Sequence, residues 1–396
     1  MVNSPHRFAI SAPAVFDGDQ FRENHCVVIE GGCITELIPA RDCPPDLPLT
    51  QLPSGTLAPG FIDLQVNGGG DVLFNNAPDP HTLATMLQAH RGKGSTSILP
   101  TLLSATRTDQ EAAVNAVRAA RSMPDSGILG LHLEGPHFAP DRRGAHSEKQ
   151  LRALLAEDVE WLCGLRDIPL MVTLAPECVA ADALARLAAS GLILCAGHSD
   201  ASFEQLAAAA ASGLQGVTHL YNAMRQLHAR APGMVGGALT LDLLWAGIIA
   251  DGHHVHPAAL RLAYQAKPRG RLILVSDAMA TVGGSSGVCE LYGETIREEA
   301  GRLVNDRGVL AGSAIGLIDA VRYAHATAGL PLDEALRMAS LYPAAIMRLD
   351  HSLGRLRPGY RADLVHFDDS FTVTDTWLAG RSLPQPGTGG APIRTV

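Results

Sequence analysis

Short apolar segments recur along the middle of the chain, and stretches rich in Ala, Leu, Arg and Glu with helical spacing lie between most of them. Each apolar segment ends in polar or small residues, as strands do. The alternation of strands with helices is typical of a parallel sheet. The predicted strands cover residues 61–66, 96–100, 128–133, 170–174, 192–196, 216–219, 246–250 and 272–276.

Eight parallel strands is the number that closes a (β/α)8 barrel. A doubly wound open sheet would give a similar pattern, so the positions of the ionisable residues have to decide. Four such residues come at or directly after the carboxyl ends of four different predicted strands: Glu134, His198, His219 and Asp277. These strand ends form the catalytic face of a barrel. The sequence therefore predicts an α/β fold with a TIM-like barrel over residues 56–354.

The two ends of the chain have a different pattern. Short alternating strands are predicted at 8–16 and within 25–38, with turn residues between them, and the tail from about residue 354 is similar. We therefore predict a small β-sandwich domain built from both ends, residues 1–55 and 355–396.

Helices are predicted in the gaps between the strands. The segment 201–211 is one example, with Asp200 placed to cap its start and the Ser212-Gly213 pair placed to end it. Two more helices, at 314–328 and 332–348, are expected between the barrel and the tail.

Charge and composition exclude some classes of protein. The net charge is −9, from 31 basic and 40 acidic residues, which argues against a nucleic-acid partner. No apolar run is long enough to span a bilayer, and the start lacks a secretory signal pattern, so we expect a cytoplasmic protein without a membrane partner. The seven cysteines include no C-x-x-C pair and are expected to be reduced thiols.

The four strand-end residues fit a catalytic metal site. Zinc takes nitrogen and oxygen ligands, and a catalytic site offers three of them and leaves one position open for water. Glu134, His198 and His219 would supply this set. Asp277 would act as the base that takes a proton from the attacking water.

One metal ion per chain is expected. Binuclear barrels of this type commonly take two ligands from an H-x-H on the first strand, where this chain has Gln65-Val66-Asn67. Carboxamides are weak metal ligands. Glu177, after the fourth strand, is interpreted as a rim charge, with a weak extra ligand as the alternative. Zn2+ is the expected ion, while Fe2+, Co2+ and Mn2+ are alternatives that availability would decide.

Several motifs carry a resemblance to a known family. They are HLEGPH at 132–137, GHSDA at 197–201, THLYNAM at 218–224, ADGHH at 250–254, SDAM at 276–279 and LAGS at 310–313. In this order the chain resembles the N-acetylglucosamine-6-phosphate deacetylases of the amidohydrolase superfamily. The resemblance extends from APGFID at 58–63 to the GRLRPGYRADLV of the tail.

The resemblance implies hydrolysis of the acetamido group of an amino-sugar 6-phosphate, giving glucosamine 6-phosphate and acetate. It assigns the metal to Glu134, His198 and His219 and the acid/base role to Asp277. His146 matches a histidine beside the amide carbonyl, where it would stabilise the oxyanion. Further substrate contacts are implied for Ala145, His146, Asn222, Ala223, Leu310, Ala311 and Gly312.

The sugar phosphate needs local cations on a chain of charge −9. The resemblance assigns Arg230 and His254 to the phosphate and implies a homodimer in which the phosphate site lies near the interface. Arg225, His228 and His253 are expected to be solvated loop residues.

Other functions stay open from the sequence. The enzyme could prefer N-acetylgalactosamine 6-phosphate, which differs only in the direction of one hydroxyl. It could hydrolyse another acylamino compound or a cyclic amide, or it could be a metal-free scaffolding relative. A nucleotide-binding interpretation of NGGGDV at 67–72 fails because the G-x-G-x-x-G spacing is missing.

Overall fold

The computed structural model describes residues 7–123 and 126–382. Its centre is an eight-stranded parallel sheet with the order β15-β14-β13-β12-β11-β10-β9-β6. The first and last strands meet where the Asp277 amide donates to the Gln65 carbonyl at 3.0 Å, so the sheet forms the predicted barrel. The strands are β6 (Phe61–Val66), β9 (Ser95–Leu103), β10 (Leu131–Glu134), β11 (Leu170–Leu174), β12 (Ile193–Ala196), β13 (Gly216–Val217), β14 (Trp245–Ile249) and β15 (Leu272–Val275).

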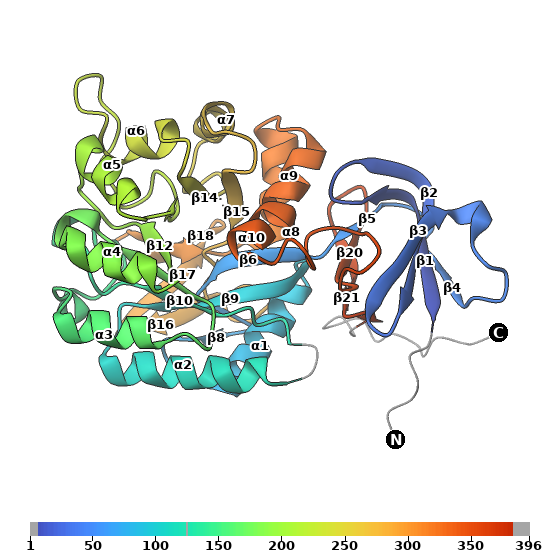
Figure 1. Cartoon of the computed structure of the whole chain (residues 1–396), viewed down its shortest axis with the longest axis horizontal. Helices are drawn as coiled ribbons and strands as arrows, with labels where there is room; N and C mark the ends of the chain where they lie inside the picture. The colour runs from blue at the N-terminus through green and yellow to red at the C-terminus, as the bar shows by residue number, and fades with distance from the viewer. Residues whose placement is uncertain (1–6, 124–125, 383–396) are drawn as a thin grey trace.

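Helices surround the barrel (Figure 1). The core lies between them and the strands, where apolar side chains such as Leu83, Leu99 and Ile248 are buried. The helices are α1 (Pro80–Arg91), α2 (Arg107–Arg121), α3 (Ala156–Gly164), α4 (Ala181–Ala189), α5 (Phe203–Ala211), α6 (Gly233–Thr240), α7 (Pro257–Ala266), α8 (Leu317–Arg322), α9 (Leu332–Ala339) and α10 (Leu341–Ile346).

The predicted cap of α5 is wrong, whereas its predicted end is confirmed. Ser202, not Asp200, accepts the amide of Gln205 at the start of the helix, and the Gln205 side chain accepts the Ser202 amide in return. The helix ends at Ala211, followed by Gly213 with φ +104°. Asp200 lies outside the helix and pairs with arginines of neighbouring loops.

The two helices before the tail are less regular than predicted. The first begins at Leu317 and continues as a turn of π-helix over Tyr323–Thr327. The second is broken at Ser340 into α9 and α10. Pro343 explains the break, because proline has no N–H to donate four residues back and its ring clashes with that carbonyl.

Both chain ends build one separate β-sheet, at the right of Figure 1. β5 connects the two ends, because it pairs with β1 from the N-terminal part and with β20 from the C-terminal part, and then leads directly into β6. The predicted ranges also include residues 1–6 and 383–396, which lie outside the described residues. The strands are β1 (Phe8–Phe16), β2 (Phe21–Glu30), β3 (Cys33–Pro39), β4 (Leu49–Gln51), β5 (Thr56–Pro59), β20 (Leu364–Phe367), β21 (Val373–Leu378) and β22 (Arg381–Ser382).

An antiparallel sheet that the sequence pattern did not predict lies between β15 and α8. It packs on the barrel through Leu291, Ile296 and Leu303, and a small hairpin of β7 (Gly68–Gly69) and β8 (Val72–Leu73) lies beside it. The antiparallel sheet, which we call the insertion sheet, has four strands: β16 (Val288–Leu291), β17 (Glu294–Glu299), β18 (Arg302–Asn305) and β19 (Leu310–Ser313).

Among the described helices, none combines the length and the apolar composition needed to cross a membrane.

Candidate active site

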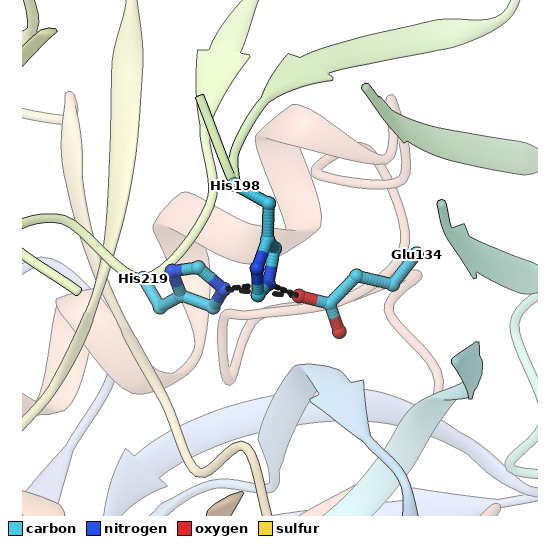
Figure 2. Close-up of side chains that lie close together, drawn as sticks. All are labelled: Glu134, His198 and His219. Atoms are coloured by element: carbon cyan, nitrogen blue, oxygen red, sulfur yellow. Dashed lines mark hydrogen bonds and ion pairs between the residues drawn. The ribbon is translucent and has the colours of Figure 1, made fainter. Parts of the chain in front are cut away.

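Three of the predicted residues meet at the carboxyl end of the barrel (Figure 2). Glu134 is the last residue of β10, His198 follows β12 and His219 follows β13. The Glu134 Oε1 lies 3.2 Å from the Nε2 of His198 and 3.0 Å from the Nε2 of His219, and the two nitrogens are 3.0 Å apart. Within the described chain this is the one group whose ligand atoms converge closely enough for a metal ion.

The backbone at these strand ends is strained. His198, His219 and Asp277 have φ values of +48°, +33° and +52°, in the left-handed region that residues other than glycine rarely adopt. Such conformations persist where the surrounding fold imposes them and are common at functional sites. At each of these three positions the backbone turns sharply as it leaves the strand. The three side chains lie at the mouth of the barrel, where they line the cavity.

The protonation pattern of the cluster fits a cation. The Nδ1 of His198 lies 2.8 Å from the Arg142 carbonyl, to which it donates, so the Nε2 carries a lone pair. Burial lowers the pKa of His198, while at His219 the partner Glu134 outweighs burial and raises the pKa. Burial acts to raise the pKa of Glu134, but the two histidines lower it well below its usual range. An ionised carboxylate and a nitrogen lone pair directed at one point are a donor set for a divalent ion.

Two carboxamides occupy the place where H-x-H would supply further ligands. The Gln65 amide donates to Glu134 Oε2 at 3.2 Å and to Asp277 Oδ1 at 3.1 Å, and the Asn67 amide donates to the same Oδ1 at 2.7 Å. Burial, followed by the charge of Glu134, raises the pKa of Asp277 to about 6. These amide groups therefore hold the two carboxylates by donating hydrogen bonds.

His146 lies beside the cluster as a neutral ring. Its centroid is 4.5 Å from that of His198, and both rings contact Phe138. Burial, and then the neighbouring His198, lowers the pKa of His146 well below its usual value. Its Nδ1 lies 3.2 Å from the Ser104 amide nitrogen and 2.8 Å from the Ser104 hydroxyl.

A cavity of about 430 Å3 opens over the cluster. Its walls include every predicted site residue except Arg230: Glu134, Ala145, His146, His198, His219, Asn222, Ala223, His254, Asp277, Leu310, Ala311 and Gly312. His254 donates through Nδ1 to Asp251 at 2.6 Å, which leaves its Nε2 as the remaining polar atom of the ring. Gly312, with φ +65°, has no room for a side chain, since a Cβ would lie 2.8 Å from the Asp277 carbonyl.

Arg230 lies outside this cavity, exposed on the loop between β13 and α6. Glu177 is a rim residue as predicted, because it accepts hydrogen bonds from the Ser199 hydroxyl and the Asp200 amide and so holds the loop that carries His198. His228 and His253 are exposed, as expected. Arg225 is partly buried and pairs with Asp200 at 3.2 Å.

Some cavity and supporting residues were not assigned from the sequence. Arg142 lines the cavity while its carbonyl holds His198, and Ser104 contacts His146. Ser104 directly follows β9, and this strand-end position is the signal in the sequence that points to it. Leu291 is the last residue of β16 and Val309 directly precedes β19, so both line the cavity from a region whose sheet the sequence pattern did not predict.

Comparison with known proteins gives consistent findings. A family model described as "Amidohydrolase family" matches residues 56–383. An N-acetylgalactosamine-6-phosphate deacetylase from Shewanella sp. (strain ANA-3) is 42% identical over 342 residues, 86% of this chain and 86% of that protein.

Solved structures of similar proteins share the whole fold. N-acetylglucosamine-6-phosphate deacetylase from Pasteurella multocida has a TM-score of 0.92 and 33% identity, covering 95% of this chain and 99% of that one. The Mycobacterium smegmatis enzyme, an aspartate-to-alanine variant in complex with N-acetyl-D-glucosamine 6-phosphate, has a TM-score of 0.88 and 32% identity. It covers 96% of this chain and 99% of its own.

Proposed function

Because the chain belongs to the amidohydrolase family, we propose that it hydrolyses N-acetyl-D-glucosamine 6-phosphate to D-glucosamine 6-phosphate and acetate in a metal-dependent reaction. The observation that carries the proposal is the convergence of Glu134, His198 and His219 in a cavity that Asp277 and His254 also line. This combination offers ligands for a metal ion, a base and a group for the substrate phosphate.

Glu134, His198 and His219 would hold one divalent ion, which we expect to be Zn2+. When bound, the ion would supply Lewis acidity toward the acetyl carbonyl and toward an attacking water. Gln65 and Asn67 donate hydrogen bonds here, so they would not add ligands for a second ion.

Asp277 would serve as base and then as acid. The carboxylate takes one proton from the water as its oxygen bonds to the acetyl carbon, and it delivers that proton to the amine nitrogen as the C–N bond breaks. Asn67 and Gln65 both occupy Oδ1, which leaves Oδ2 for the transfer. His146 would donate a hydrogen bond to the carbonyl oxygen while negative charge develops there.

The rest of the cavity would hold the sugar phosphate. His254 faces the cavity, whereas Arg230 is exposed on its loop, so we assign Arg230 of the partner subunit in a homodimer to complete the phosphate site. Ala145, Asn222, Ala223 and Leu310–Gly312 would contact the sugar, largely through main-chain groups. We place the reaction in the cytoplasm, because a charged sugar phosphate does not cross a bilayer unaided.

The galacto epimer is the second candidate substrate. The 42% identical relative from Shewanella is an N-acetylgalactosamine-6-phosphate deacetylase. The two substrates differ in the direction of one hydroxyl, which one or two hydrogen bonds discriminate.

The test is acetate release by the zinc-loaded protein on both 6-phosphates and on unphosphorylated N-acetylglucosamine, with the bound metal counted by elemental analysis. We expect turnover of N-acetylglucosamine 6-phosphate, about one ion per chain, and little activity without the phosphate. Turnover of the galacto epimer alone would select the second candidate. A protein that binds metal but hydrolyses neither sugar would refute both and favour a cyclic-amide substrate, and one without metal would favour a scaffolding role.

A further inference from the structure

The end of β9 reaches the active site although it supplies none of the residues assigned above. Leu103, the last residue of β9, lines the cavity, and the next residue, Ser104, is 1% exposed. A buried serine at the carboxyl end of a barrel strand lies where catalytic groups are usually carried.

Ser104 contacts His146 twice. The backbone N–H of Ser104 lies 3.2 Å from the Nδ1 of His146, and the Ser104 hydroxyl lies 2.8 Å from the same nitrogen. A backbone N–H can only donate, so Nδ1 must be an acceptor without hydrogen. The neutral ring then carries its hydrogen on Nε2, the nitrogen on the other side of the ring from Ser104.

Ser104 is itself held in place from two directions. Asn75 donates to the Leu103 carbonyl at 3.0 Å and accepts the Leu103 amide at 2.9 Å, which fixes the main chain before Ser104. Tyr292, in the turn between β16 and β17 of the insertion sheet, donates its hydroxyl to the Ser104 carbonyl at 2.7 Å.

The surroundings leave this serine little freedom. A Cβ on Gly135, the residue after the ligand Glu134, would lie 2.4 Å from the Ser104 hydroxyl. Gly135 has φ +91°, so a side chain there would also strain the backbone. The hydroxyl therefore packs against the loop that follows Glu134 while it faces His146.

We propose that Ser104 and Tyr292 are positioning residues that hold His146 as the tautomer with hydrogen on Nε2, ready to donate to the acetyl carbonyl oxygen. This inference rests on the proposed function, because it gives His146 the carbonyl-stabilising role. Tyr292 acts through Ser104, and Ser104 acts through His146, so neither touches the substrate.

A double-mutant cycle separates positioning from a merely structural role. We expect His146→Gln to lower kcat by about 100-fold or more, Ser104→Ala by about three- to tenfold and Tyr292→Phe by about threefold, with KM within about twofold of the parent in the last two. Adding Ser104→Ala to His146→Gln should then change kcat by less than about twofold. If Ser104→Ala lowers kcat by the same factor in the parent protein and in His146→Gln, the proposal is wrong.

Tyr360→Phe is the matched control. The Tyr360 hydroxyl also donates to a main-chain carbonyl, that of Asp350 at 2.6 Å, and the residue is 8% exposed. It belongs to the small domain core, so its loss should leave kcat unchanged. An equal fall of kcat in Tyr360→Phe and Tyr292→Phe would mean that general destabilisation, not positioning, explains both.

The tautomer can be read independently of catalysis. In protein labelled with 15N-histidine, the ring nitrogens of His146, assigned by their loss in His146→Gln, should report hydrogen on Nε2 in the parent and in Tyr360→Phe. Ser104→Ala keeps the backbone N–H but loses the hydroxyl, and Tyr292→Phe loosens the main chain that carries both groups. Each variant should therefore add a minor fraction of the tautomer with hydrogen on Nδ1. Hydrogen on Nδ1 in the parent overturns the proposal. Correct tautomer signals in a protein that hydrolyses neither sugar would support the positioning while the proposed function fails.

Discussion

In the proposed reaction, hydrolysis depends most directly on Asp277. Asp277→Asn keeps the shape of the side chain but cannot accept a proton, so kcat should fall at least about 100-fold. The three ligand residues are untouched, and elemental analysis should still find the metal content of the parent protein. Loss of the metal in this variant would show that Asp277 is a ligand and not a base.

His90 is expected to make the stability of the protein sensitive to acid. It is fully buried on α1, its Nε2 lies 2.9 Å from the Gly68 carbonyl, and burial lowers its pKa from 6.5 to about 4. The unfolded chain therefore binds a proton between pH 6.5 and 4 that the folded chain does not, so stability falls as the pH drops through this window. Across this window, the difference between the two pKa values of His90 lowers the free energy of unfolding by about 3 kcal/mol.

The measurement is the free energy of unfolding in urea at pH 7 and pH 4.5 for the parent and for His90→Gln. The glutamine can still donate to Gly68 but takes up no proton, so its loss of stability on acidification should be smaller than that of the parent. His81→Gln changes an exposed position of the same helix, so its stability should fall between pH 7 and pH 4.5 by as much as that of the parent. Equal losses in all three proteins would remove His90 as the cause.

Among the elements, α5 shows which residue caps the start of a helix. Ser202→Ala removes the acceptor for the Gln205 amide and should lower the free energy of unfolding by about 1 kcal/mol, measured by urea denaturation. Asp200→Asn is the matched comparison, since Asp200 lies two residues earlier and bonds to Arg142 and Arg225. If Asp200→Asn lowers the free energy of unfolding more than Ser202→Ala does, Ser202 would not be the residue that caps α5.

The elements that could be predicted are those whose burial is indicated by a local run of apolar residues. The eight barrel strands are mostly apolar and buried along their whole length. The strand-end residues Glu134, His198, His219 and Asp277 followed from them. The insertion sheet was missed because its first strands are short and mostly exposed. The role of Ser104 was missed because it depends on His146, 42 residues away, which only the fold brings near.

At the scale of the whole molecule, Arg337 joins the barrel to the small β-sheet. It is 3% exposed on α9, pairs with Glu334 at 2.6 Å and donates to the main-chain carbonyls of Gly18 and Asp19. Arg337→Met leaves Glu334 with fewer partners and removes the link, so the free energy of unfolding should fall by about 3 kcal/mol.

Calorimetry should show this fall as a lower and broader transition, because the two parts of the molecule lose a shared contact. Arg118→Met is the control, since Arg118 forms an exposed pair with Asp167 that should contribute less than about 1 kcal/mol. A single transition unchanged in both variants would show that Arg337 does not couple the two parts.

The pairing of β5 with β20 has a consequence for synthesis on the ribosome. The strands from residues 8–59 emerge first, but their neighbour at 364–367 follows only after the whole barrel has been made. Until then β5 has an open edge toward the place of β20, and open edges of this kind invite pairing with other nascent chains. β20, translated after the barrel, therefore closes the sheet that β1 to β5 begin before it.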